Sequence, residues 1–270
     1  MSFLDRIAES NRFDPSHFRP WYVGDMLAGW MKPTLVKALK PWPEVFVVSD
    51  EQVRLHPRLE GFEQRTHALA QVNRALVDAG VIDHLHGELY PIKSAFHVKP
   101  LLLIDRACAP YFGIRAWGQH LNGYVRRDGE IWMWIGKRSE QKRTFPGKLD
   151  NLVAGGLPHG LGLKENLIKE CREEASIPPA LCERIVSTGA ISYCVETPQG
   201  LKPDVMFCYD LELPESFTPI CQDGEVAEFF LWPLQKVADI VRDTTDFKRN
   251  CNLTIIDFLL RHGFLKSDHP

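Results

Sequence analysis

Four glutamates lie within ten residues of one another in the segment 155–178, GGLPHGLGLKENLIKECREEASIP. On an α-helix, three of them, Glu170, Glu173 and Glu174, occupy positions i, i+3 and i+4 and therefore share one face. Like charges at this spacing destabilise an exposed helix by about 0.2–0.5 kcal/mol per pair. A hard divalent ion that prefers oxygen ligands, Mg²⁺ or Mn²⁺, would offset this repulsion better than zinc. The pattern predicts a metal-binding helix, with a solvated acidic face as the alternative.

Two glycines precede this helix and add a feature that is typical of phosphate binding. Gly155 and Gly156 follow the residues NLVA at 151–154. This order predicts a strand that runs into a tight loop, where the backbone can approach an anion and a metal ion closely. Strand, glycine loop and acidic helix together indicate a site for a small molecule that carries a diphosphate.

Basic residues precede the glycine loop, where they could bind diphosphate oxygens. Five lie between positions 137 and 148: Lys137, Arg138, Lys142, Arg143 and Lys148. Arg138 directly follows an apolar strand and is the preferred contact, because arginine can bind a phosphate group through two parallel hydrogen bonds. We expect Lys142 and Lys148 to bind substrate as well, together with the backbone of Gly155 and Gly156.

The elements that must position these residues lie in the second part of the chain. Residues 118–139 predict a hairpin, because Asp128-Gly129 is a strong signal for a two-residue turn. Three further strands are expected within 187–197, 202–213 and 224–234, with the acidic helix inserted before them. Residues 251–264 predict an amphipathic closing helix. We expect an α/β fold over residues 116–270, with a mixed sheet between the acidic helix and the closing helix.

The first 115 residues predict a smaller α+β domain. Glu63 to Ala79 carries leucines and valines at helical spacing and predicts a helix. Residues 44–50 (EVFVVSD) predict a strand, and residues 99–114 are expected to begin as a buried strand or helix. The sequence thus predicts two domains, at 1–115 and 116–270.

Composition narrows the class of protein. The chain has 270 residues, 44% of them hydrophobic and 25% charged, which is typical of a globular protein with a sizeable core. A net charge of −3 argues against a nucleic-acid polymer as partner.

No apolar run approaches membrane-spanning length. Seven cysteines without a CxxC pair favour a reducing compartment, and we expect the cytosol. A homodimer is left open as the assembly.

The acidic segment resembles the box of the Nudix hydrolases, which reads G, five residues, E, seven residues, then R-E-apolar-x-E-E-x-G. Aligned on Glu170, Gly155 takes the opening position and Lys169 the arginine position, while Glu173 and Glu174 are the paired acids. The chain departs from the pattern at three positions: Leu161 replaces the early glutamate, Lys169 the arginine, and Ser176 the late glycine. Glu165 lies one turn after Leu161 and could take over the role of the early glutamate.

The resemblance implies roles for these side chains. Glu170, Glu173 and Glu174 would bind the metal ion and act in catalysis. Lys169 would be a further catalytic residue, paired to a neighbouring carboxylate. Glu225 begins the segment EVAEFFLW, from which an acid often reaches the metal centre in this family, so we expect it to be the general base. Glu228 is the alternative. Together these similarities cover residues 116 to about 245 and imply the Nudix α/β/α sandwich.

A closer resemblance indicates a substrate. KLDNLVAGGLPHG (148–160) and ENLIKECREEASIP (165–178) are similar to a Nudix subgroup that has an extra N-terminal domain and is fused in some eukaryotes to thiamin pyrophosphokinase. This implies Mg²⁺-dependent hydrolysis of thiamin diphosphate or its oxidised analogues to the monophosphate. Two alternatives stay open: an enzyme like isopentenyl-diphosphate isomerase, although residues 151–154 lack the cysteine such enzymes use, and a catalytically weak metabolite-binding protein.

Overall fold

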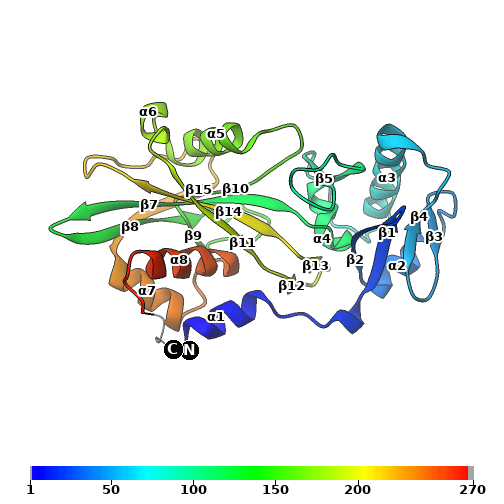
Figure 1. Cartoon of the computed structure of the whole chain (residues 1–270), viewed down its shortest axis with the longest axis horizontal. Helices are drawn as coiled ribbons and strands as arrows, with labels where there is room; N and C mark the ends of the chain where they lie inside the picture. The colour runs from blue at the N-terminus through cyan, green and yellow to red at the C-terminus, as the bar shows by residue number, and fades with distance from the viewer. Residues whose placement is uncertain (1, 267–270) are drawn as a thin grey trace.

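The computed structural model describes residues 2–266 and divides into two sheet-based halves (Figure 1). The first half contains a four-stranded sheet of order β2-β1-β4-β3 and a separate hairpin, β5-β6. Its strands are β1 Arg19–Val23, β2 Met26–Met31, β3 Phe46–Val48, β4 Val53–Leu55, β5 Leu89–Ile92 and β6 Leu102–Asp105. Its helical segments are η1 Pro15–His17, α2 Pro33–Leu39, α3 Gly61–Asp78, η2 Arg106–Cys108 and α4 Ala109–Phe112. The predicted α+β character of this half is confirmed.

The second half is built on a seven-stranded mixed sheet. Five strands follow the order β11-β14-β7-β8-β15, while β10 pairs with β7 and β9 with β8. The β7–β14 pairing is parallel and the other pairings in this sheet are antiparallel. The strands are β7 Trp117–Arg127, β8 Glu130–Arg138, β9 Leu149–Asp150, β10 Val153–Gly156, β11 Val186–Ser192, β14 Val205–Glu212 and β15 Val226–Pro233, with a small hairpin of β12 Val195–Glu196 and β13 Leu201–Lys202.

Helices cover both faces of this sheet (Figure 1). On one face, α5 Leu163–Ala175 and α6 Pro179–Cys182 close a core that includes Leu121, Leu167 and Leu211. On the other, α7 Leu234–Asp243 and α8 Arg249–Arg261 close a second core. The predicted α/β/α sandwich is confirmed, because the apolar stripe of each helix is buried against its own face of the sheet.

The first helix of the chain packs on the second half. This helix, α1 Phe3–Ser10, contacts α7 and α8, and Phe3 is buried in the core beneath them. Its Arg6 side chain donates from Nε to the Val241 carbonyl oxygen at 3.0 Å. The chain therefore begins on the face of the large sheet that lies opposite α5, as Figure 1 shows.

Most predicted elements are present. The β7–β8 turn has positive φ angles at Asp128 (51°) and Gly129 (82°), as this type of hairpin requires. One local prediction is wrong: Gly155 and Gly156 do not form a loop but are the last two residues of β10, paired with Gln119 and Gly118 of β7. Because the two glycines have no side chains, groups of other elements can approach this strand closely. The turn follows the strand, at residues 159–160.

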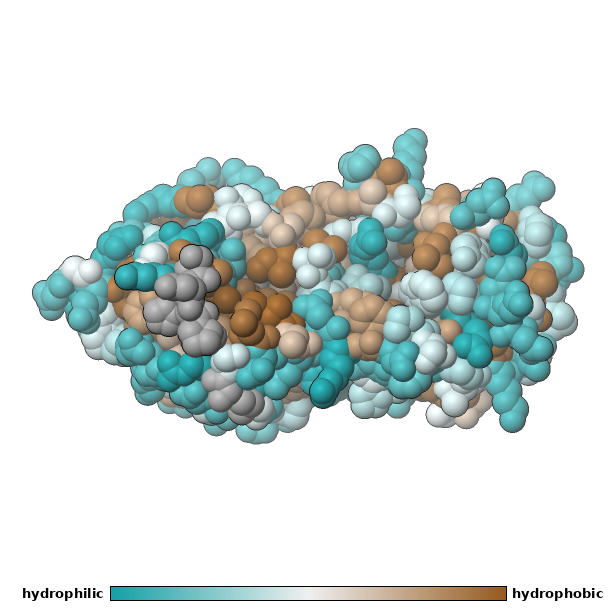
Figure 2. Space-filling model, turned by 60° about the horizontal axis from the view of Figure 1, so that its bottom comes forward, coloured by the Kyte–Doolittle hydropathy of each residue, from teal (hydrophilic) through white to brown (hydrophobic). Residues whose placement is uncertain are grey.

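The surface mixes polar and apolar groups. In Figure 2, hydrophobic residues gather along the middle of the face shown, and hydrophilic residues dominate both ends. Within the described residues, no helix combines the length and the apolar character needed to cross a membrane.

Candidate active site

Glu174 is the most deeply buried acid of the predicted metal-binding face. It lies near the C-terminal end of α5 with 6% of its surface exposed, and its Oε2 accepts a hydrogen bond from the Ala154 backbone N–H at 2.8 Å. Burial raises the pKa of Glu174 well above its ordinary value, and repulsion from the nearby Glu170, Asp150 and Glu225 raises it further. The fold thus concentrates negative charge at the end of β10.

Glu170 lies against the glycine pair of β10. A Cβ atom built on Gly155 would be 2.5 Å from Glu170 Cδ, so the glycine leaves the space that this carboxylate occupies. Burial raises the pKa of Glu170, although the neighbouring Lys169 opposes the shift. Lys169 Nζ lies 3.3 Å from Glu170 Oε1 and 2.9 Å from Glu173 Oε2, so it pairs with two acids of the set.

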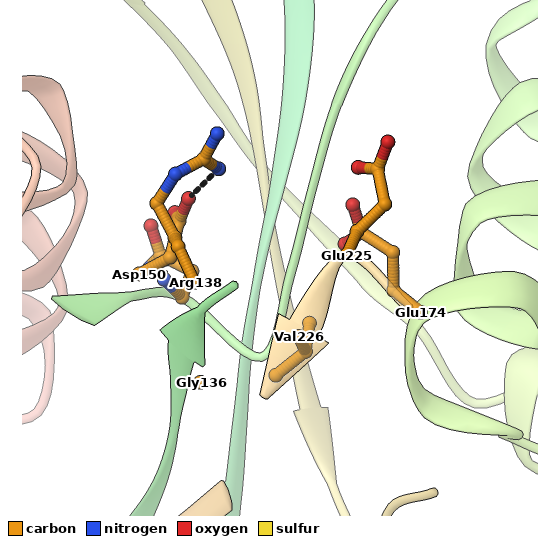
Figure 3. Close-up of a pocket in the computed structure, with 7 residues that line it drawn as sticks. Gly136, Arg138, Asp150, Glu174, Glu225 and Val226 are labelled. Atoms are coloured by element: carbon orange, nitrogen blue, oxygen red, sulfur yellow. Dashed lines mark hydrogen bonds and ion pairs between the residues drawn. The ribbon is translucent and has the colours of Figure 1, made fainter. Parts of the chain in front are cut away.

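Glu225 lines the same small pocket as Glu174 but comes from the residue before β15. It immediately precedes β15 and forms an ion pair with Lys142. Burial alone would raise the pKa of Glu225, but the Lys142 hydrogen bond and charge hold it below the ordinary value. Figure 3 shows Glu225 and Glu174 side by side, facing the Arg138–Asp150 pair across a small pocket.

The oxygen ligands of the acidic face are of the type that a divalent cation prefers. Among residues 2–266, the buried Glu174 carboxylate has one hydrogen-bond donor, the Ala154 N–H, and its other oxygen has none. A buried carboxylate is stable only when it is paired, hydrogen-bonded or bound to a metal. Carboxylate oxygens are the donors that Mg²⁺ and Mn²⁺ prefer. The role of Glu170, Glu173 and Glu174 as ligands of one ion stays a prediction, because Glu173 is paired with Lys169 and the ligand atoms of the three acids do not form a group as tight as that of His120, Asp150 and Cys251.

Arg138 has a different environment from the one expected. The guanidinium is buried, with Nη1 2.8 Å from Asp150 Oδ2 and further hydrogen bonds to the carbonyl oxygens of Thr144 and Phe145. Asp150 is also paired with Lys248 Nζ at 3.0 Å. Arg138 as a phosphate contact stays a prediction, and in the structure its guanidinium holds Asp150 and the residues Thr144 and Phe145 of the loop before β9.

The other predicted substrate residues are only partly brought together. Lys142 is near the acids through Glu225, whereas Lys148 Nζ donates to the Thr245 carbonyl oxygen at 2.7 Å. Gly156 adjoins Gly155, and its carbonyl oxygen accepts from Asn166 of α5 at 3.0 Å. The two glycines therefore contribute by leaving room for neighbouring side chains and by making backbone hydrogen bonds.

A second group of side chains that could bind a metal ion adjoins the pocket and shares Asp150 with its lining. Ligand atoms of His120, Asp150 and Cys251 all lie within 4.8 Å of one another, and the three residues are buried. Cys251 Sγ donates to Asp150 Oδ1 at 2.7 Å, and His120 Nδ1 lies 2.8 Å from Asn151 Oδ1. Because Asp150 already has Arg138 and Lys248 as cationic partners, this group serves as a buried polar framework better than as a metal site.

Two side chains that the sequence did not indicate approach the site from the first half. Tyr90 of β5 and Arg106 of η2 lie against Gly156. The charge of Arg106 lowers the pKa of both Glu170 and Glu225. No local sequence pattern marks these residues, because they reach the acids only through the packing of the two halves.

The mixed sheet with helices on both faces and a cluster of carboxylates near β10 defines an α/β/α protein of the hydrolase type expected from the sequence. Comparison with known families agrees: the NUDIX domain family matches residues 122–251, and a domain of unknown function (DUF4743) matches residues 2–116. Nudix hydrolase 20, chloroplastic, of Arabidopsis thaliana is 44% identical over 98% of this chain and 74% of its own length. Nudix hydrolase 24, chloroplastic, of the same plant is 44% identical over 99% of this chain and 74% of its own.

The chain belongs to the Nudix hydrolase family and is an enzyme of that class. Among solved structures, the NUDIX domain of Shewanella oneidensis NrtR, complexed with ADP ribose, is 16% identical, with a TM-score of 0.44 over 56% of this chain and 90% of that one.

The expected cytosolic location is wrong on these comparisons, since both Arabidopsis relatives are named chloroplastic. The seven cysteines are free thiols in the structure.

Proposed function

We propose that this Nudix hydrolase uses Mg²⁺ or Mn²⁺ to cleave the diphosphate linkage of thiamin diphosphate or, preferably, an oxidised analogue, and releases the monophosphate. One observation supports the hydrolytic part: Glu174 and Glu225 line the same pocket, and the charges of Glu170 and Glu225 add to burial in raising the pKa of Glu174. Such a group of acids attracts a divalent cation, and the cleavage of a diphosphate uses the same kind of cation.

In this proposal, Glu170, Glu173 and Glu174 hold the ion. When bound, the ion screens the charge of the phosphoryl oxygens and acidifies the attacking water. Glu225 is ionised at neutral pH, because its pKa lies below the ordinary value, and it accepts the proton of that water. The water oxygen forms the new bond to phosphorus, the bridging P–O bond breaks, and the bridging oxygen leaves with the monophosphate.

The thiamin part of the proposal rests on the resemblance of residues 148–160 and 165–178 to the thiamin-related subgroup. The match to DUF4743 over residues 2–116 supports an enzyme with an additional N-terminal domain. We propose that residues 1–115 and 116–270 are the two domains, with α1 crossing to pack on the second.

A screen of purified enzyme tests both parts of the proposal. Thiamin diphosphate, its oxidised analogues, ADP-ribose, NADH and nucleoside diphosphates would be incubated with Mg²⁺ or Mn²⁺, and phosphate release would rank kcat/KM. We expect the oxidised thiamin compounds to rank first. Selectivity for ADP-ribose or a nucleotide over every thiamin compound would overturn the substrate assignment and leave hydrolysis intact. Metal-independent turnover would overturn the catalytic role of the acids.

A further inference from the structure

The active-site edge of the large sheet is in contact with a strip of the first half formed by β5 and η2. The His159 backbone N–H donates to the Leu89 carbonyl oxygen at 2.7 Å, which ties the loop after β10 to β5. A Cβ atom built on Gly156 would collide with Tyr90 Oη and would lie 3.2 Å from Arg106 Cζ. Two side chains of the first half therefore lie directly on the second glycine of the pair.

Tyr90 presents a hydroxyl group that has no partner in the described chain. Its side chain is buried, and among residues 2–266 Tyr90 Oη makes no hydrogen bond. Burial raises the pKa of Tyr90 to about 12, so the hydroxyl keeps its proton and remains a donor. The hydroxyl oxygen is not among the fully enclosed, unpartnered polar atoms of the described residues, so a polar ligand at this position can reach it and accept its proton in a hydrogen bond.

Arg106 lies beside Tyr90 and is only partly engaged. Its Nη1 lies 2.6 Å from Glu88 Oε2, and its guanidinium carbon lies 5.7 Å from the centre of the Tyr90 ring. Within the described part of the chain, Nε and Nη2 make no hydrogen bond. About a third of the side chain, 36%, is exposed. Glu88 thus orients a guanidinium group that retains free donors.

The other cations near the acids are ion-paired with carboxylates of the site itself, whereas Glu88, the partner of Arg106, belongs to the first half. Arg138 is paired with Asp150, Lys142 with Glu225, and Lys169 with Glu170 and Glu173. A diphosphate brings several negative charges to a site that is already rich in carboxylates, and one metal ion would not contact all of its oxygens. Arg106 is positioned to supply the missing charge, because it already acts electrostatically on Glu170 and Glu225.

We propose that Arg106 and Tyr90 form an anion-binding subsite through which the first domain binds the diphosphate of the substrate. The subsite rests on the proposed diphosphate hydrolysis and extends it, because it makes the N-terminal domain part of the substrate site. The guanidinium donates charge-assisted hydrogen bonds to phosphoryl oxygens, and the tyrosine hydroxyl donates one more. Gly156 has no side chain, so both groups can reach the ligand across β10.

Full-length variants test this subsite. Arg106→Ala, Arg106→Lys and Tyr90→Phe would be compared with Arg74→Ala, which removes an exposed arginine from α3 of the same half. Two quantities would be measured: KM and kcat for the best diphosphate of the substrate screen, and the Kd of inorganic pyrophosphate in the presence of Mg²⁺, by calorimetry.

We expect Arg106→Ala to raise both KM and the pyrophosphate Kd by about 10- to 100-fold, because a charge-assisted hydrogen bond is lost. Arg106→Lys should recover part of the loss, and Tyr90→Phe should raise both constants by about 2- to 10-fold. Arg74→Ala should match the wild type. Tyr90→Phe changes one atom only and keeps the test decisive if Arg106→Ala fails to fold.

Two results would overturn the subsite. One is a KM and a pyrophosphate Kd in Arg106→Ala and Tyr90→Phe equal to those of Arg74→Ala. The other is a lower kcat and melting temperature with unchanged KM and Kd, which would show that the pair only docks the domains. A wild-type enzyme that hydrolyses no diphosphate would instead refute the proposed function, and the pyrophosphate measurement would still decide the subsite.

Discussion

At the residue scale, the three glutamates of the metal-binding face differ in surroundings although they are identical in type. Glu174 is buried and receives a backbone hydrogen bond, Glu170 lies over Gly155, and Glu173 is more exposed and pairs with Lys169. The acids therefore share one ion in the proposal but differ in how strongly the protein fixes them.

Removing charge from this face should abolish most turnover. We expect Glu173→Gln and Glu174→Gln each to lower kcat by about 100-fold or more while the protein stays folded, because the amide keeps the shape but loses the charge that holds the ion. Lys169→Ala should have a weaker effect. Steady-state kinetics across a range of Mg²⁺ concentrations would measure this, and unchanged kinetics in both glutamine variants would contradict the metal role.

Arg138 should matter for stability more than for binding. Arg138→Ala leaves the buried Asp150 carboxylate without its closest cation, and breaking a buried pair in this way typically costs about 3–5 kcal/mol of unfolding free energy. The control is Arg126→Ala, which removes an exposed ion pair with Glu212 and should cost about 0–1 kcal/mol. Urea unfolding of both variants gives the comparison, and equal losses would contradict the structural role of Arg138.

At the scale of elements, catalytic geometry depends on how closely α5 approaches β10. The strand ends in two glycines, and each leaves space for a group from another element: Glu170 of α5 above Gly155, and Tyr90 and Arg106 against Gly156. These glycines therefore serve close packing within a strand, whereas the local sequence predicts a tight loop.

Adding one methyl group should disturb this contact. Gly155→Ala places a Cβ atom 2.5 Å from Glu170 Cδ, so either the carboxylate or the strand must move. We expect kcat to fall by about 10-fold or more, because small displacements of catalytic groups are costly. Gly162→Ala is the matched control, since a Cβ atom there has no neighbour within 4 Å. Kinetics of the two variants should differ sharply, and similar values would refute the packing argument.

At the scale of the whole molecule, the two halves are joined at more than one place. The first half supplies Tyr90 and Arg106 at the active-site edge, and α1 packs on the opposite face of the large sheet. Lys32 of the first half also pairs with Glu196 of the second at 3.2 Å. The N-terminal segment is therefore part of the hydrolase core as well as of the preceding domain.

The contribution of α1 can be measured with two adjacent residues. Phe3 is 5% exposed within the core under α7 and α8, whereas Leu4 is 62% exposed. Phe3→Ala should lower the unfolding free energy by about 3–5 kcal/mol, since it leaves a cavity. Leu4→Ala should change it by less than about 0.5 kcal/mol. Denaturant titration would show the difference, and an equally mild Phe3→Ala would mean that α1 adds little to the core.

Local sequence determined those features of this protein that depend on neighbours along the chain. Helical spacing placed Glu170, Glu173 and Glu174 on one face, and Asp128-Gly129 specified the β7–β8 hairpin, because both follow from short-range backbone geometry. Only the tertiary structure decided the burial of Arg138 against Asp150, the docking of α1 and the approach of Arg106 to Gly156. These contacts join residues that are distant in sequence, so they depend on how strands and domains pack and leave no periodic pattern in the sequence.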